Sequence, residues 1–172
     1  MPKIIEDLPR RLMEEARRQV LESGYSSMTI RSVAKGCGVG TGTVYNYYAS
    51  KDALVAAFLL VDWRDRMEKV CLCARSAEDP EYVLRSIHYN LAQFCTAYAA
   101  IFRDPAAAVG FSGSFGRYHA LLRSQLAEPV RGFCPDDFTA EFIAEAMLVW
   151  TVAGKPFEEI YQPVSKLFHK ER

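Results

Sequence analysis

The hydrophobic positions along the chain recur at helical spacing. Between Leu8 and Ser23, the apolar residues Leu8, Leu12, Ala16 and Val20 follow one another every four residues, with arginines between them. This spacing places them on one face of an amphipathic helix. No segment shows the alternation of apolar and polar residues that is typical of a half-buried strand. The pattern therefore predicts an all-α protein.

Glycines, prolines and capping residues divide this pattern into separate helices. Gly24 and Gly38 suit the turns that end helices, and Thr29 and Ser50 suit helix N-caps. The Gly/Ser-rich stretch 110–114 predicts a loop, and Pro163 is expected to kink or interrupt the last helix. The predicted helices are 8–23, 29–36, 41–47, 50–75, 81–102, 115–133, 137–154 and 156–169.

Length and composition exclude several classes of protein. The 172 residues are half hydrophobic, which excludes intrinsic disorder and low-complexity polymers. The longest uncharged stretch, 86–102, is too short and too polar to span a membrane. The first residues show no signal peptide, and the five cysteines have no framework spacing. We therefore expect a cytoplasmic protein with reduced thiols and no membrane partner.

The charge distribution is more informative than the net charge of zero. The first 51 residues carry eight basic and five acidic side chains, whereas the remaining residues carry 13 basic and 16 acidic ones. A basic head on an acidic body fits a polyanion-binding module joined to a second functional part.

The most informative segment is 29–54, with the sequence TIRSVAKGCGVGTGTVYNYYASKDAL. Two short predicted helices are separated by a glycine-containing turn, and a third helix follows, as in a helix-turn-helix. The small residues at 41–43 would let the second helix sit deep in a major groove. We therefore predict a helix-turn-helix DNA-binding domain over 1–50 and a helical effector-binding and dimerisation domain over 51–172.

Residues 12–54 resemble the DNA-binding domain of the TetR (tetracycline repressor) family of bacterial transcription regulators. An ordered set of short motifs over some forty residues carries this resemblance: Gly24-Tyr25, Thr29, Val33-Ala34, Gly38-Val39, Thr43-Val44-Tyr45, Tyr47-Tyr48 and Ser50-Lys51-Asp52-Ala53-Leu54. Gly40 departs from the family pattern, which commonly has a serine N-cap at this position.

The resemblance implies a set of DNA-binding residues: Thr29, Arg31, Thr41, Thr43, Tyr45, Tyr47 and Lys51. Tyr48 is expected to belong to the core. Chemistry supports the role of Lys51 independently, because a lysine in the first turn of a helix opposes the helix dipole. A phosphate bound by both the helix N-terminus and the ammonium explains this placement.

The resemblance also implies a ligand cavity in the helical body. The candidate effector-binding residues are Trp63, Met67, His88, Leu91, Phe94, Tyr98, Phe102, Phe111 and Tyr118. Among them, the polar His88 and Tyr98 are the best candidates to orient a ligand. An aromatic stripe is more often ordinary core, and a protein effector is the alternative to a small molecule.

The last two predicted helices are apolar on more than one side, whereas a surface helix needs only one apolar stripe. The second stripe indicates a two-fold dimer interface, with deeper packing inside one subunit as the alternative. The candidate interface residues are Phe138, Phe142, Met147, Val149, Trp150, Phe157, Ile160, Tyr161, Leu167 and Phe168.

Together, these features predict a homodimeric regulator that binds a pseudo-palindromic operator in double-stranded DNA. It would be a repressor released by an effector. The alternatives are a helical protein-interaction regulator without a small-molecule ligand, or a cysteine-dependent enzyme. His88 and Cys95 share a helix face, but two ligands are too few for a metal site. No convergent acid–base or nucleophile set is visible, so we expect no catalysis, no metal and no cofactor.

Overall fold

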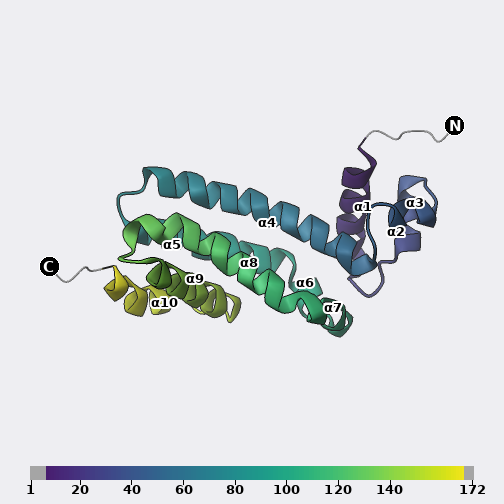
Figure 1. Ribbon diagram of the computed structural model, residues 1–172. Coiled ribbons are helices and arrows are strands. Elements are labelled where there is room, and N and C mark those ends of the chain that lie inside the picture. The colour runs from purple at the N-terminus through teal and green to yellow at the C-terminus, as the bar shows by residue number, and fades with distance from the viewer. Residues whose placement is uncertain (1–6, 169–172) are drawn as a thin grey trace. The chain divides into compact units, whose positions relative to one another are not determined.

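The computed structural model describes residues 7–168, and this part of the chain is helical without any strand (Figure 1). The all-α prediction is confirmed. The α-helices are α1 Leu8–Ser23, α2 Ile30–Cys37, α3 Thr41–Tyr45, α4 Lys51–Ser76, α5 Pro80–Ala97, α6 Ala99–Phe102, α7 Pro105–Phe111, α8 Phe115–Ala127, α9 Asp137–Val152 and α10 Phe157–Val164. Short 3-10 helices follow α7, α8 and α10. None of the helices within 7–168 is long and apolar enough to cross a membrane.

Contacts divide the chain into two units. The first unit contains the described residues through Asp62 together with Tyr98–Gly113, and the second contains Trp63–Ala97 and the residues from Ser114 onward. The first half of α4 belongs to the first unit and its second half to the second. The first unit is therefore assembled from two separate stretches of sequence, and the boundary at residue 50 stays a prediction.

Helix α1 buries the four apolar residues that the periodicity placed on one face, Leu8, Leu12, Ala16 and Val20. Helix α2 begins with a capping box, in which Thr29 Oγ1 accepts a hydrogen bond from Ser32 N and Ser32 Oγ accepts one from Thr29 N, both at 3.0 Å. Gly38 ends α2 in the left-handed conformation, with φ of 69°. Local sequence signals therefore define both ends of this helix.

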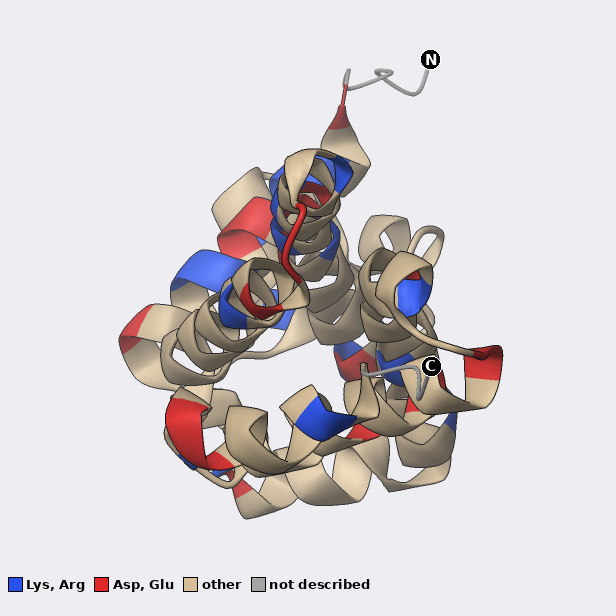
Figure 2. Ribbon diagram, turned by 90° about the vertical axis from the view of Figure 1, so that its left-hand side faces the viewer, with Lys and Arg blue, Asp and Glu red and all other residues tan. Residues whose placement is uncertain are grey.

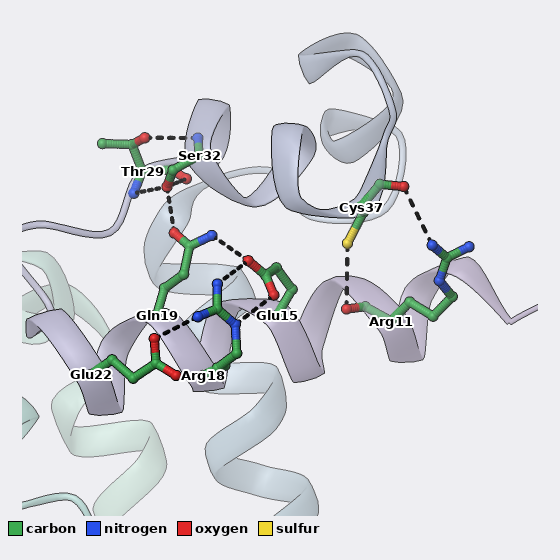
Figure 3. A network of polar contacts seen from close by, with 8 residues as sticks. All are labelled: Arg11, Glu15, Arg18, Gln19, Glu22, Thr29, Ser32 and Cys37. Atoms are coloured by element: carbon green, nitrogen blue, oxygen red, sulfur yellow. Dashed lines mark hydrogen bonds and ion pairs between the residues drawn. The ribbon is translucent and has the colours of Figure 1, made fainter.

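A polar network connects α1 to both ends of α2 (Figure 3). Near the start of α2, Ser32 Oγ donates to Gln19 Oε1, and Gln19 in turn donates to Glu15 at 2.7 Å. At the end of α2, Cys37 Sγ donates to the Arg11 carbonyl at 3.5 Å. These contacts fix α2 on α1, and they add to the apolar contact between the two helices.

The predicted single helix over 81–102 is wrong, because the α-helix stops at Ala97 and resumes at Ala99. Tyr98 has φ of −113° and ψ of 19°, and its side chain is fully buried. Its ring lies 6.0 Å from that of Phe58, and its hydroxyl accepts a hydrogen bond from Arg17 Nε at 3.0 Å. The break at Tyr98 accompanies these contacts with α1 and α4.

Helix α7 replaces part of the predicted loop at 110–114. Asp104 is its N-cap and accepts a hydrogen bond from Ala106 N at 2.8 Å, while Pro105 occupies the first helical position. An aspartate followed by proline is a known start signal for a helix. The Gly110 and Ser112 signals near its end suggested a loop instead.

The second unit has its core between α5, α8 and α9. Val83, Leu84 and Ile87 of α5 are buried, as are Ile143 and Met147 of α9. From α4, Trp63 Nε1 donates to Gln125 Oε1 of α8 at 2.7 Å. The last α-helix stops at Val164, just after Pro163, where the sequence predicts a kink or an interruption. The predicted helix over 156–169 is therefore too long, since a 3-10 helix follows over Ser165–Leu167, and His169 lies outside the described residues.

Charged residues of opposite sign are interspersed along the helices (Figure 2). Arg85, for example, pairs with Glu81 of its own helix at 2.8 Å and with Glu158 of α10 at 3.1 Å. These pairs are exposed, so each contributes little to the free energy of unfolding.

Gly38→Ala should lower the free energy of unfolding by about 1–2 kcal/mol, because a Cβ is disfavoured in the left-handed region. The matched control is Gly42→Ala, since Gly42 lies in α3 without positive φ and with open space around it. This control should be neutral or stabilising by up to about 1 kcal/mol. Urea unfolding of the full chain measures both, and equal losses would contradict the assignment of Gly38.

Candidate DNA-binding surface

Helix α3 is held by one side chain and exposes most of the others. Val44 is fully buried and anchors the helix. Thr41 is exposed and Thr43 half-buried, while Tyr45 is 55% exposed and Tyr47, just after the helix, is 50% exposed. Two exposed tyrosines around one short helix are costly in water without a partner, which favours a binding surface.

The N-terminus of α3 lacks a side-chain cap. Gly40 is the N-cap, and only its carbonyl takes part, accepting a hydrogen bond from Thr43 N at 3.0 Å. The backbone groups at this end are therefore left to water or to a ligand. The hydroxyl of Thr41 lies at the same end.

The turn between α2 and α3 is tight. Val39 N donates to the Ala34 carbonyl at 2.9 Å and Gly38 N to the Lys35 carbonyl at 3.1 Å. Arg31 and Thr29, at the start of α2, are both exposed. Thr29 has a structural role as well, since it caps α2.

Tyr48 differs from its exposed neighbours. It is half-buried, and its hydroxyl donates to the Pro9 carbonyl at 3.1 Å. This inward contact agrees with its exclusion from the predicted DNA-binding set.

Lys51 is the first residue of α4, after the N-cap Ser50, whose Oγ accepts a hydrogen bond from Ala53 N at 3.0 Å. The Lys51 ammonium lies 4.0 Å from the centre of the Tyr25 ring. Burial lowers the pKa of Lys51, and the neighbouring Asp104 and Asp52 oppose this shift. Lys51, which is predicted to bind a phosphate, is thus half-buried against the face of the Tyr25 ring.

Tyr25 and Asp52 are residues that sequence reasoning did not include in the site. Tyr25 is 3% exposed, and its hydroxyl donates to Asp52 Oδ1. Burial, and after it the hydrogen bond to Asp52, raise the pKa of Tyr25 well above its ordinary value. Both residues belong to the motifs that carry the family resemblance, but their contact spans 27 positions and has no local signal.

The predicted effector-binding residues are divided between the two units. Trp63, Met67, Leu91 and Phe94 are buried in the second unit, where the Trp63 and Phe94 rings meet edge to face at 5.4 Å. Tyr118 is half-buried in that unit. Tyr98, Phe102 and Phe111 belong to the first unit, where Tyr98 is fully buried and Phe102 is 52% exposed.

His88 and Tyr98, which were expected to orient a ligand, have protein partners. His88 Nε2 lies 3.0 Å from the Lys155 carbonyl, and its ring packs edge to face on Phe157. A hollow of about 440 Å³ lies along α9 and α10, and another of about 350 Å³ lies between the start of α5, Phe133 and the C-terminal segment. Neither is lined by any predicted effector residue. The effector set therefore stays a prediction.

The predicted dimer residues separate into exposed and buried groups. Phe138, Phe142, Val149 and Trp150 of α9 are between 43% and 76% exposed. Met147, Phe157 and Ile160 are buried within the chain, as the alternative of deeper packing expects. Tyr161, Leu167 and Phe168 are half-buried. The larger hollow lies in this region and is lined by Phe142, Ala146, Trp150, Lys155, Glu159, Ile160, Pro163, Val164 and Leu167.

Four of the five cysteines are poorly suited to nucleophilic catalysis. Burial raises the pKa of Cys37, Cys71, Cys95 and Cys134, which keeps these thiols protonated and weakly nucleophilic. Across residues 7–168, no group of three or more His, Cys, Asp or Glu side chains is arranged to bind a metal ion.

The arrangement of α1–α4 defines a helix-turn-helix domain, and comparisons with known proteins agree. Residues 12–58 match the model of the bacterial regulatory proteins of the tetR family. The chain is 35% identical over 52 residues to the transcriptional regulator UidR of Escherichia coli, a match that covers 30% of this chain and 26% of UidR. It is 34% identical over 74 residues to the repressor Rv1474c of Mycobacterium tuberculosis, covering 41% of this chain and 39% of that protein.

Solved structures resemble the chain over most of its length. RolR without ligand superposes with a TM-score of 0.64 at 18% identity, covering 94% of this chain and 91% of RolR. The TetR-family repressor FadR of Thermus thermophilus, solved with lauroyl-CoA, gives 0.60 at 19% identity, with 93% and 92% covered. At these identities the likeness concerns the fold. Residues 12–58 therefore form a DNA-binding domain of the kind found in the tetR family of bacterial regulatory proteins, while the rest of the chain matches the solved repressors in fold.

Proposed function

We propose that this chain is a transcription regulator that binds double-stranded DNA through α3. The observation that supports this most is the exposure of Thr41, Tyr45 and Tyr47 around a helix whose one buried residue is Val44. In a helix-turn-helix, residues at the start of the second helix contact base edges in the major groove. Exposed hydroxyl and phenol groups at these positions suit both bases and phosphates.

The remaining predicted contacts surround this helix. Lys51 would bind a backbone phosphate together with the N-terminus of α4. Arg31 and Thr29 would approach the DNA from the start of α2, and Thr43 from the middle of α3. Phosphate contacts of this kind set the register of the protein on the duplex, whereas base contacts determine sequence preference.

The proposed regulator acts as a homodimer on a pseudo-palindromic operator. A single short recognition helix reads only a few base pairs, so a second copy one helical turn away supplies specificity. The exposed aromatic residues Phe138, Phe142 and Trp150 of α9 support an interface between two copies. Burying these side chains against a second copy is favourable because it removes apolar surface from water.

We further propose a cytoplasmic repressor whose effector binds the second unit. The solved FadR repressor with lauroyl-CoA supports a small molecule as the effector class. Its candidate site contains the apolar cluster of Trp63, Met67, Leu91 and Phe94. Helix α4 contributes to both units. An effector that shifts the second half of α4 would therefore also move Lys51 at its start, which is one of the proposed DNA-binding residues.

Footprinting on the DNA upstream of the chain's own gene tests the function directly. We expect one protected region that contains two half-sites related by a two-fold axis, centred 10–11 base pairs apart or at a multiple of about that spacing. The absence of any protected duplex, at protein concentrations in the micromolar range, would contradict DNA binding.

Two substitutions separate phosphate binding from base reading. Lys51→Ala should weaken binding to every duplex and reduce the salt slope of the association constant by about one unit. Tyr47→Ala should instead change the preference among operator variants by about 1–3 kcal/mol at the contacted base pair. Fluorescence anisotropy titrations at several salt concentrations measure both, and an unchanged slope for Lys51→Ala would rule out the phosphate contact.

The dimer is tested by placing a charge on α9. Phe142→Asp should shift the chain toward monomer in sedimentation velocity, because an unpaired carboxylate is expensive to bury. Tyr82→Asp is the matched control, since Tyr82 is a comparably exposed aromatic residue on α5. If both variants sediment like the parent dimer, α9 is not the interface.

A further inference from the structure

Three side chains at the start of α4 form a continuous chain of contacts. The Lys51 ammonium lies 4.0 Å from the centre of the Tyr25 ring, and the Tyr25 hydroxyl donates to Asp52 Oδ1. Lys51 and Asp52 are neighbours on α4, whereas Tyr25 comes from the segment between α1 and α2. The ammonium of Lys51 thus contacts the face of the buried Tyr25 ring, and the carboxylate of Asp52, the next residue on the same helix, binds the hydroxyl of that ring.

The two contacts reinforce each other electrostatically. A cation over an aromatic ring is attracted by the negative face of the ring. When a carboxylate accepts the phenol hydrogen, electron density in the ring rises, which strengthens this attraction. Tyr25 is only 3% exposed, and such interactions are stronger in a poorly hydrated environment.

The ring contact leaves the donors of Lys51 available. Within residues 7–168, no group accepts a hydrogen bond from its Nζ, which contacts the ring instead. A lysine side chain normally loses much conformational freedom when it binds a phosphate. An ammonium already restricted by the ring loses less, so its binding to a phosphate is more favourable.

Helix α7 covers the Tyr25–Asp52 pair. A Cβ atom at Gly110 would lie 2.5 Å from Asp52 Oδ1 and 2.9 Å from Tyr25 Oη, so only glycine permits this approach. At the other end of α7, Asp104 Oδ2 accepts hydrogen bonds from Ser26 N at 3.1 Å and Ser26 Oγ at 2.7 Å. The pair is therefore enclosed by an element far away in the sequence.

We propose that Tyr25 and Asp52 are positioning residues for DNA binding, which hold the Lys51 ammonium where it meets a backbone phosphate. This inference rests on the proposed function. It assigns a role to two residues that do not themselves touch DNA, and it makes Gly110 the residue that allows α7 to enclose them.

A double-mutant cycle on the full chain tests the proposal. Tyr25→Leu removes the ring and should weaken binding to the footprinted duplex by about 5–10-fold, consistent with a partly desolvated cation–π contact. In the Lys51→Ala background, the same change should weaken binding less than about 2-fold, because the group that it positions is gone. Equal losses in the two backgrounds would mean that Tyr25 only stabilises the fold.

Milder variants keep the test valid if Tyr25→Leu does not fold. Asp52→Asn still accepts the phenol hydrogen but lacks the charge, and it should weaken binding about 2–3-fold, again only when Lys51 is present. Tyr48→Phe is the matched control, since it removes a tyrosine hydroxyl bonded to the Pro9 carbonyl of the same unit. It should leave DNA affinity and salt slope unchanged in the folded protein.

Gly110→Ala tests the enclosure by α7. The added Cβ should displace the Tyr25–Asp52 pair and weaken DNA binding in a manner that also depends on Lys51. Gly113→Ala is its control, because Gly113 follows in the same stretch and a Cβ atom there would meet nothing within 4 Å. Similar effects of the two alanines would contradict the role given to Gly110.

A second readout does not involve DNA. In the free protein, the Tyr25 ring current should shift the NMR signals of the Lys51 ε-methylene protons upfield, and Tyr25→Leu should abolish this shift. A parent protein without the shift would overturn the inference while leaving DNA binding intact. If the parent binds no duplex at all, the proposed function fails and the inference with it.

Discussion

A helix of five residues cannot sustain its own conformation in water, because so few hydrogen bonds do not offset the entropy of ordering them. Helix α3 is such a helix, and its N-terminus lacks a side-chain cap. Its geometry is therefore imposed by Val44, by the turn at Gly38 and by the attachment of α2 to α1. The surface proposed to read DNA depends on these contacts behind it rather than on its own residues.

Local sequence signals were sufficient to predict the buried face of α1 and the ends of α2. The four-residue spacing from Leu8 to Val20 identified the buried face of α1, and the Thr29 cap and Gly38 turn defined the ends of α2. Both depend on residues a few positions apart, which sequence patterns report well. The exposure of Tyr45 and Tyr47, with Tyr48 turned inward, also agrees with the pattern.

Contacts between distant residues were beyond the reach of the sequence. The sequence offers Tyr98 as a residue of one long helix that orients a ligand, yet its hydroxyl accepts a hydrogen bond from Arg17, 81 positions earlier. Likewise, the sequence offers His88 as a ligand-orienting residue, and no local signal indicates that its Nε2 lies 3.0 Å from the Lys155 carbonyl. In both cases the side chain satisfies its polar group with a partner from another part of the chain, and no local pattern specifies which partner that is.

The assembly of the first unit from two stretches has a consequence during protein synthesis. A ribosome adds about 5–20 residues per second, so Tyr98 is made roughly 4–16 s after Arg17. Until Tyr98–Gly113 has emerged, the nascent N-terminal helices lack the partner of Arg17 and the helix that covers Tyr25 and Asp52. The first unit can complete its native packing only after more than half of the chain has been translated. It therefore folds later than a domain of the same size that is made from one continuous stretch.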